Sequence, residues 1–220
     1  GLEKQRIIEK QMEIDIARVE QRGFAGDHFP QSLVDTYNYY CDWAGIRPSV
    51  NDTRNLWQLG QSVYKYKTEP YPGMEATLQS LTRQGHELHL YTGGEPEIQR
   101  QKIRSHKLER FFGERIYIRR HKNEAALDEI LSSGRFDRSR TWMVGNSLRT
   151  DVLPAIRNGI HAIYLKAEQE WSFNIVEIHD QPKGALLKLA SLRHVPKAIS
   201  EYAGLRTVAS IRMADLGSDH

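Results

Sequence analysis

The chain has 220 residues, a length that fits one large domain or a core with a smaller companion, and either can bury a sizeable core. It carries 31 Lys and Arg residues against 28 Asp and Glu residues, and a net charge of only +3 argues against nucleic-acid binding by electrostatics. No run approaches the roughly 18 consecutive apolar residues of a membrane span, and no signal-peptide pattern opens the chain. The single cysteine, Cys41, cannot form an internal disulfide, so we predict a cytoplasmic protein. From the charge and the apolar runs we expect neither a membrane nor a nucleic-acid partner.

Residues 1–68 show apolar side chains at helical spacing and no strand pattern. Glycine and proline interrupt the helical pattern at residues 22–23, 26–30 and 45–48, and Asp52 or Thr53 is a candidate cap for the helix that follows. We therefore predict a helical domain of three or four helices over residues 1–68.

The composition changes at residues 69–73, Glu-Pro-Tyr-Pro-Gly, where we place the domain boundary. Helical patterns and short apolar runs alternate beyond it. We expect strands over residues 87–91, 115–118, 141–144 and 161–165, and helices over residues 74–84, 96–106, 123–131, 152–158 and 184–193. Such alternation predicts an α/β domain over residues 69–220, with a doubly wound parallel sheet covered on both faces. The sequence after about residue 200 gives no assignment.

The first candidate site residues follow the strand expected over residues 87–91. Thr92 and Gly93 would stand at the carboxyl end of this strand, where open parallel sheets bind ligands. A threonine hydroxyl can donate to a phosphate oxygen, and glycine lets its N–H approach the same anion because it has no Cβ. A threonine that ends a strand in a tight turn is the simpler structural interpretation.

Lys122 precedes the helix expected over residues 123–131. Its ammonium group can neutralise a phosphate and a carboxylate together, which makes Lys122 a candidate for substrate binding and catalysis. The alternative is a surface lysine in the basic run of residues 115–122.

A polar turn, Gly145-Asn146-Ser147, follows the strand expected over residues 141–144, and Asp151 lies shortly after it. Magnesium prefers oxygen ligands and keeps several waters, so the carboxylate of Asp151 and the side-chain carbonyl of Asn146 are candidate metal ligands. Asp151 also stands where its charge would complement the dipole of the next helix, and the two roles are compatible.

The region of residues 71–173 resembles the haloacid dehalogenase superfamily of hydrolases. The resemblance rests on the order and spacing of Leu90-Tyr91-Thr92-Gly93-Gly94, Lys122, Val144-Gly145-Asn146-Ser147, Asp151 and Asn158-Gly159. The helical module at residues 1–68 is similar to the cap that many members insert after their first catalytic motif. The chain thus resembles the capped, phosphatase-like branch, which has a Rossmann-like core.

This resemblance implies a magnesium-dependent phosphatase that acts on a small phosphate ester through an aspartyl-phosphate intermediate. Thr92 and the Gly93 N–H would hold the phosphoryl oxygens, and Lys122 would steady the nucleophile and the phosphate. Asp151 and Asn146 would hold Mg²⁺, although Asn146 stands where many members carry an aspartate.

The family's first strand, which ends in an Asp-x-Asp nucleophile motif, does not precede the helical module here. The chain begins at Gly1 and enters a helical pattern directly, so we expect a core that lacks its first strand and a nucleophile that lies outside this sequence. Proteins rarely leave a central sheet edge open, which favours this interpretation. The alternative is a catalytically inactive relative that binds a phosphorylated ligand or a protein partner, and a haloacid dehalogenase is less favoured. The substrate and the oligomeric state do not follow from the sequence.

Overall fold

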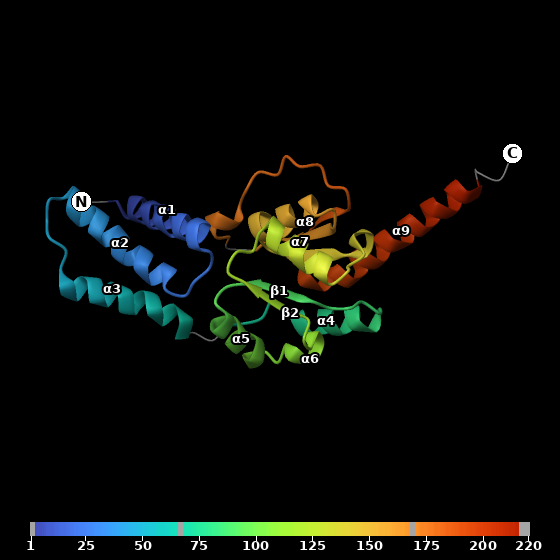
Figure 1. The fold of residues 1–220 in the computed structure, drawn as a ribbon, viewed down its shortest axis with the longest axis horizontal. Coiled ribbons are helices and arrows are strands. Elements are labelled where there is room, and N and C mark those ends of the chain that lie inside the picture. Colours follow the sequence, from blue (N-terminus) through green and yellow to red (C-terminus); the bar gives the residue numbers. More distant parts are fainter. Residues whose placement is uncertain (1–2, 66–67, 168–169, 216–220) are drawn as a thin grey trace.

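The computed structural model describes residues 3–65, 68–167 and 170–215, with side chains described up to residue 205. Three helices, α1 (Lys4–Arg22), α2 (His28–Trp43) and α3 (Val50–Ser62), gather at one end of the molecule, on the left of Figure 1. α2 lies between the other two helices and is buried on two sides: Ser32 accepts a hydrogen bond from Gln11 of α1, and Pro30 lies against Gly60 of α3. These helices make up the described part of the expected helical domain.

Two local features fix where α3 begins and how closely it packs. Ser49 caps the helix, because its hydroxyl accepts the Asp52 N–H at 3.3 Å. The cap expected at Asp52 or Thr53 is therefore wrong by a few residues. Gly60 lies against α2 so closely that a Cβ atom there would stand 2.4 Å from the Cα atom of Pro30.

The rest of the chain alternates between helices and strands. In chain order its main elements are α4 (Met74–Arg83), β1 (Leu90–Gly93), α5 (Pro96–Ser105), α6 (Glu109–Phe112), β2 (Ile116–Arg119), α7 (Glu124–Ser133), β3 (Trp142–Gly145), η3 (Leu148–Val152), α8 (Leu153–Arg157), β4 (His161–Leu165), η4 (Ser172–Asn174), β5 (Leu186–Leu189) and α9 (Val195–Asp215). The predicted α/β class is confirmed.

The strands form two parallel sheets. β1 pairs with β2, so that Leu90 lies opposite Ile116. β4 lies between β3 and β5 in the second sheet. Within the described residues, no strand pairs with the other edge of β1 or of β3.

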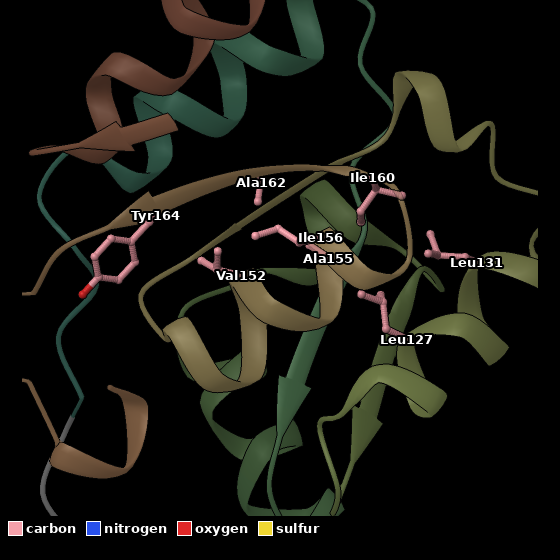
Figure 2. Close-up of a cluster of buried hydrophobic side chains, with 8 residues drawn as sticks. All are labelled: Leu127, Leu131, Val152, Ala155, Ile156, Ile160, Ala162 and Tyr164. Carbon is pink, nitrogen blue, oxygen red and sulfur yellow. The ribbon is translucent and has the colours of Figure 1, made fainter. Parts of the chain in front are cut away.

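Both sheets nevertheless share their hydrophobic cores. Tyr91 of β1 and Met143 of β3 pack against one cluster, whose members are Leu127, Leu131, Val152, Ala155, Ile156, Ile160, Ala162 and Tyr164. Figure 2 shows this cluster between α7, α8 and β4. On the opposite face, Leu88 and Trp142 pack against a second cluster, formed by Leu81, Ile163, Val195 and Ile199. Residues in or just before β1 and residues in β3 therefore pack on the same two clusters. This arrangement makes the unpaired edges of the two strands face each other.

Two expectations near the C-terminus change. The helix expected over residues 184–193 is wrong, because β5 lies there and pairs in parallel with β4. Leu187 and Leu189 pack on the second cluster while Leu186 is exposed, and a short apolar run of this kind fits either period. The unassigned C-terminal stretch forms α9, which is buried at Val195 and extends away from the body (Figure 1). A search of the described helices for one long and apolar enough to cross a bilayer finds none.

Candidate functional site

Lys122 and Asp151 come together at the carboxyl ends of β2 and β3. Lys122 immediately precedes Asn123, whose side chain caps α7 by accepting the Ala126 N–H at 3.0 Å. The Lys122 ammonium forms an ion pair with the Asp151 carboxylate. The two side chains are 13% and 5% exposed, respectively, so the pair is shielded from solvent.

A π-helical turn, η3, aims Asp151 back toward the end of β3. The Ser147 hydroxyl caps this turn by accepting the Thr150 N–H at 3.0 Å, and the Ser147 carbonyl accepts the Val152 N–H at 3.1 Å. One Asp151 oxygen accepts the Ser147 N–H at 3.0 Å. The same carboxylate lies so close to Gly145 that a Cβ atom there would stand 2.2 Å from it. π-Helical turns concentrate at functional sites, and this one makes the buried carboxylate possible.

Gly93 lies beside this pair, whereas Thr92 is bonded elsewhere. A Cβ atom at Gly93 would stand 2.8 Å from the Phe24 ring and 3.6 Å from Lys122 Cβ. The Thr92 hydroxyl donates to the Gln99 side-chain oxygen at 3.1 Å. The described contacts thus bring Gly93, but not the hydroxyl of Thr92, next to Lys122.

Asn146 does not contact Asp151 through any described hydrogen bond. Its side-chain amide nitrogen lies 3.4 Å from the Tyr71 hydroxyl, at the boundary between the helical and α/β parts of the chain. The two candidate metal ligands therefore point to different partners.

The Tyr91 ring lies beneath Lys122. Tyr91 was not among the site residues predicted from the sequence. The Lys122 Nζ atom lies 5.0 Å from the centroid of the Tyr91 ring, within the range of a cation–π interaction. The Tyr91 hydroxyl is buried and has no hydrogen-bond partner among the described residues. Burial raises the pKa of Tyr91, the charge of Arg119 opposes the shift, and the charge of Asp151 adds to it. Only its place directly before Thr92 could have marked it.

A cavity of about 290 Å³ opens on the other side of Lys122. It lies between the end of α1, the loop from β2 to α7, and the segment from η3 to α8. Its walls include Phe24 and Phe173, and its cationic side chains are Arg120, Lys122, Arg149 and Arg157. No local pattern in the sequence predicts this cavity, because the three segments above and η4, which carries Phe173, lie far apart in the chain.

The side-chain oxygens of Asp151, which lies beside Lys122, and of Asn146, which lies beside Tyr71, suit part of a magnesium site. Asp151 supplies a buried carboxylate and Asn146 an amide oxygen, which are the oxygen donors that Mg²⁺ prefers. Across the parts of the chain that the structure describes, no three His, Cys, Asp or Glu side chains gather as a metal cluster.

The fold resembles solved structures of hydrolases. A haloacid dehalogenase-like hydrolase from Xanthomonas campestris is 21% identical, with a TM-score of 0.71 over 92% of this chain and 79% of that chain. A HAD-hydrolase from Bacillus subtilis bound to magnesium is 13% identical, with a TM-score of 0.58 over 91% and 84%. A predicted phosphoglycolate phosphatase from Haemophilus somnus is 13% identical, with a TM-score of 0.57 over 88% and 92%. At these identities the likeness shows the fold alone.

No curated protein matches the chain significantly. The model of the haloacid dehalogenase-like hydrolase family, by contrast, matches residues 33–165, which is more than half of the chain. The match runs from α2 to the end of β4 and so spans Thr92, Lys122 and Asp151. The chain therefore belongs to the family of haloacid dehalogenase-like hydrolases.

Proposed function

We propose that the gene product is a magnesium-dependent phosphatase that cleaves a small phosphate ester in the cytoplasm. The observation that carries the proposal is the buried Lys122–Asp151 ion pair beside Gly93, at the carboxyl ends of parallel strands. A surface lysine would not be 13% exposed and paired with a carboxylate that is itself buried. The cytoplasmic assignment rests on the single, buried Cys41.

Each residue has a role that its position supports. The Lys122 ammonium would stabilise the negative charge that grows on the phosphoryl oxygens as an aspartate attacks phosphorus and the ester P–O bond breaks. The Gly93 N–H and the Thr92 hydroxyl would bind phosphoryl oxygens, for which Thr92 would turn from Gln99. Mg²⁺, held by Asp151 and Asn146, would neutralise phosphate charge when bound. Water then cleaves the aspartyl-phosphate and frees inorganic phosphate.

The unpaired edges of β1 and β3 support a nucleophile on a strand outside the 220 residues. The Leu90 N–H donates to the Arg115 carbonyl, and the Gly94 N–H donates to the Arg119 carbonyl, so both peptide groups face β2. Because successive peptide groups of a strand point to opposite sides, those of Tyr91 and Gly93 point away from β2. A parallel strand between β1 and β3 would satisfy these groups. Its carboxyl end would lie beside Lys122, where the nucleophile has to stand.

The test is hydrolysis by the gene product with any segment that precedes Gly1. We expect release of inorganic phosphate from a simple ester, such as benzyl phosphate, in the presence of Mg²⁺ and none after its removal with a chelator. Asp151→Ala should remove the magnesium-dependent turnover while circular dichroism stays unchanged. Full turnover by this variant at ordinary Mg²⁺ concentrations would contradict the metal assignment.

The runner-up is a catalytically inactive protein that binds a phosphorylated ligand or a protein partner, and the buried Lys122–Asp151 pair would serve phosphate binding in it as well. It predicts binding of phosphate esters by the complete gene product with no turnover. A haloacid dehalogenase, the third possibility, would release halide from a 2-haloacid, so the same preparation distinguishes all three.

A further inference from the structure

We infer that the cavity beside Lys122 binds the leaving group of the substrate and selects esters that carry a second anionic group on a flat apolar body. The inference rests on the proposed function, because it takes Lys122 as the phosphate-binding group. Lys122 lines the cavity and also pairs with Asp151, and Phe24 both covers Gly93 and lines the cavity. A phosphoryl group held at Gly93 and Lys122 would therefore direct the rest of its ester into this space.

The charge of the cavity favours an anion. Its described lining contains four cationic side chains and two carboxylates, those of Glu20 and Glu124. Glu20 pairs with Arg149 at 3.1 Å, and Glu124 with Arg157 at 3.6 Å. From outside the lining, Asp180 pairs with Arg157 at 3.3 Å and Glu95 with Arg120 at 3.9 Å. The Glu20 and Glu124 carboxylates are about half exposed, at 52% and 53%, so each of their ion pairs is worth little and a bound anion can replace its carboxylate at low cost.

The apolar wall gives the cavity its shape. The Phe24 and Phe173 rings meet edge to face with their centroids 5.8 Å apart, and Trp171 packs against both. Arg149 lies 4.8 Å from the Phe173 ring and donates its Nε–H to the Phe173 carbonyl at 2.7 Å, which holds η4 against the cavity. A wall of aromatic rings beside arginines suits a planar apolar body that ends in a carboxylate or phosphate. A volume of about 290 Å³ fits a small metabolite.

Two matched pairs of ligands test the inference with the complete gene product. Benzylphosphonate and 4-carboxybenzylphosphonate differ by one carboxylate and are not hydrolysed, so calorimetric titration with Mg²⁺ present measures binding alone. We expect the carboxylated ligand to bind about fivefold more tightly, the effect of one modest charge interaction. Hydrolysis of benzyl phosphate and 4-carboxybenzyl phosphate is measured separately.

Three variants assign any preference to the cavity. Arg157→Gln should bring the ratio of the two dissociation constants close to one, and Glu124→Gln should increase the ratio because it removes a competing carboxylate. Arg83→Gln, on α4 and outside the cavity, is the matched control and should leave the ratio unchanged. A wild-type ratio near one, or equal ratios in Arg157→Gln and Arg83→Gln, would overturn the inference. If the wild type prefers the carboxylated phosphonate but hydrolyses neither phosphate ester, the ligand preference of the cavity would stand and the proposed phosphatase activity would be rejected.

Discussion

Asp151 is a buried anion with two partners, the Lys122 ammonium and the Ser147 N–H at 3.0 Å. Removing a charge from water costs several kcal/mol, and only a close opposite charge with good hydrogen bonds compensates for it. The pair therefore does not by itself add much stability. Its loss on one side, however, would leave an uncompensated charge in the core.

Lys122→Met should lower the free energy of unfolding by about 3 kcal/mol, because the buried Asp151 carboxylate would lose its ion-pair partner. The double change Lys122→Met with Asp151→Asn should restore most of this loss. Urea unfolding measures all three proteins. Lys197→Met, which breaks an exposed ion pair with Glu201, is the control and should cost less than about 1 kcal/mol. Equal effects of Lys122→Met and Lys197→Met would show that burial is unimportant here.

His28, at the start of α2, makes the stability of the protein depend on pH. Burial lowers the pKa of His28 below its usual value of 6.5. The charge of Asp27 opposes this shift, and the charge of Arg18 adds to it. The unfolded chain then binds a proton near pH 6.5 that the folded chain resists, so His28 makes stability fall as the pH drops below about 6.5. Burial raises the pKa of Asp15 above 3.8, which acts in the opposite direction, so a variant is needed to isolate His28.

His28→Gln should weaken the loss of stability between about pH 7.5 and pH 5.5, because the variant has no proton to take up at this site. Urea unfolding at several pH values gives the slope. His179→Gln changes a histidine that is 85% exposed and should keep the wild-type slope. A wild-type slope in His28→Gln would mean that the buried histidine does not titrate as its surroundings indicate.

At the scale of the element, glycine has opposite effects on stability in two helices, α3 and α9. Gly60 is buried in α3 directly against Pro30 of α2. Gly204 in α9 has no neighbour within 4 Å of an added Cβ atom. The same residue type therefore permits close helix packing at one position and only weakens the helix at the other.

Gly60→Ala should destabilise the protein by about 1–3 kcal/mol, because the added methyl group would meet backbone atoms of α2 that cannot move independently. Gly204→Ala should be neutral or stabilise by up to about 1 kcal/mol, through higher helix propensity. Thermal unfolding followed at 222 nm, the helix wavelength, compares the two with the wild type. A stabilised Gly60→Ala protein would show that α2 and α3 pack less closely than described.

At the scale of the whole molecule, the two sheets share their cores but not their hydrogen bonds. The His161 N–H bonds to the Thr141 carbonyl, so the peptide groups of Trp142 and Val144 point away from β4, toward β1. Those of Tyr91 and Gly93 point from β1 in the opposite direction. A single parallel strand between them would join the two sheets into one.

Amide hydrogen exchange tests this arrangement. If the complete gene product supplies such a strand, the amides of Tyr91, Gly93, Trp142 and Val144 should exchange much more slowly in it than in the 220-residue chain. The amide of Ile163, in the central strand β4, is the internal control and should be protected in both. Equal exchange of the four amides in the two proteins would argue against an inserted strand.

Sequence patterns sufficed for the class of the fold and for most of its elements. β4 lies where the sequence placed it, and β2 and β3 are each displaced by one residue. β1 begins three residues later than expected and includes Thr92 and Gly93, because apolar runs locate a strand better than its ends. The sequence predicted a helix where β5 lies, because the spacing of its leucines fits both a helix and a strand. Pairing with β4 makes the segment a strand. The roles assigned to Thr92, Asn146 and the other site residues remain predictions.

The sequence by itself determined the alternation of helices and strands and the order of Thr92, Lys122 and Asp151, because period and spacing are local properties of a chain. Only the tertiary structure decided that Lys122 pairs with Asp151, that Tyr91 lies beneath them and that a basic, aromatic-walled cavity opens beside them. Such contacts join residues far apart in the chain, and burial and charge act on them only after the chain has folded.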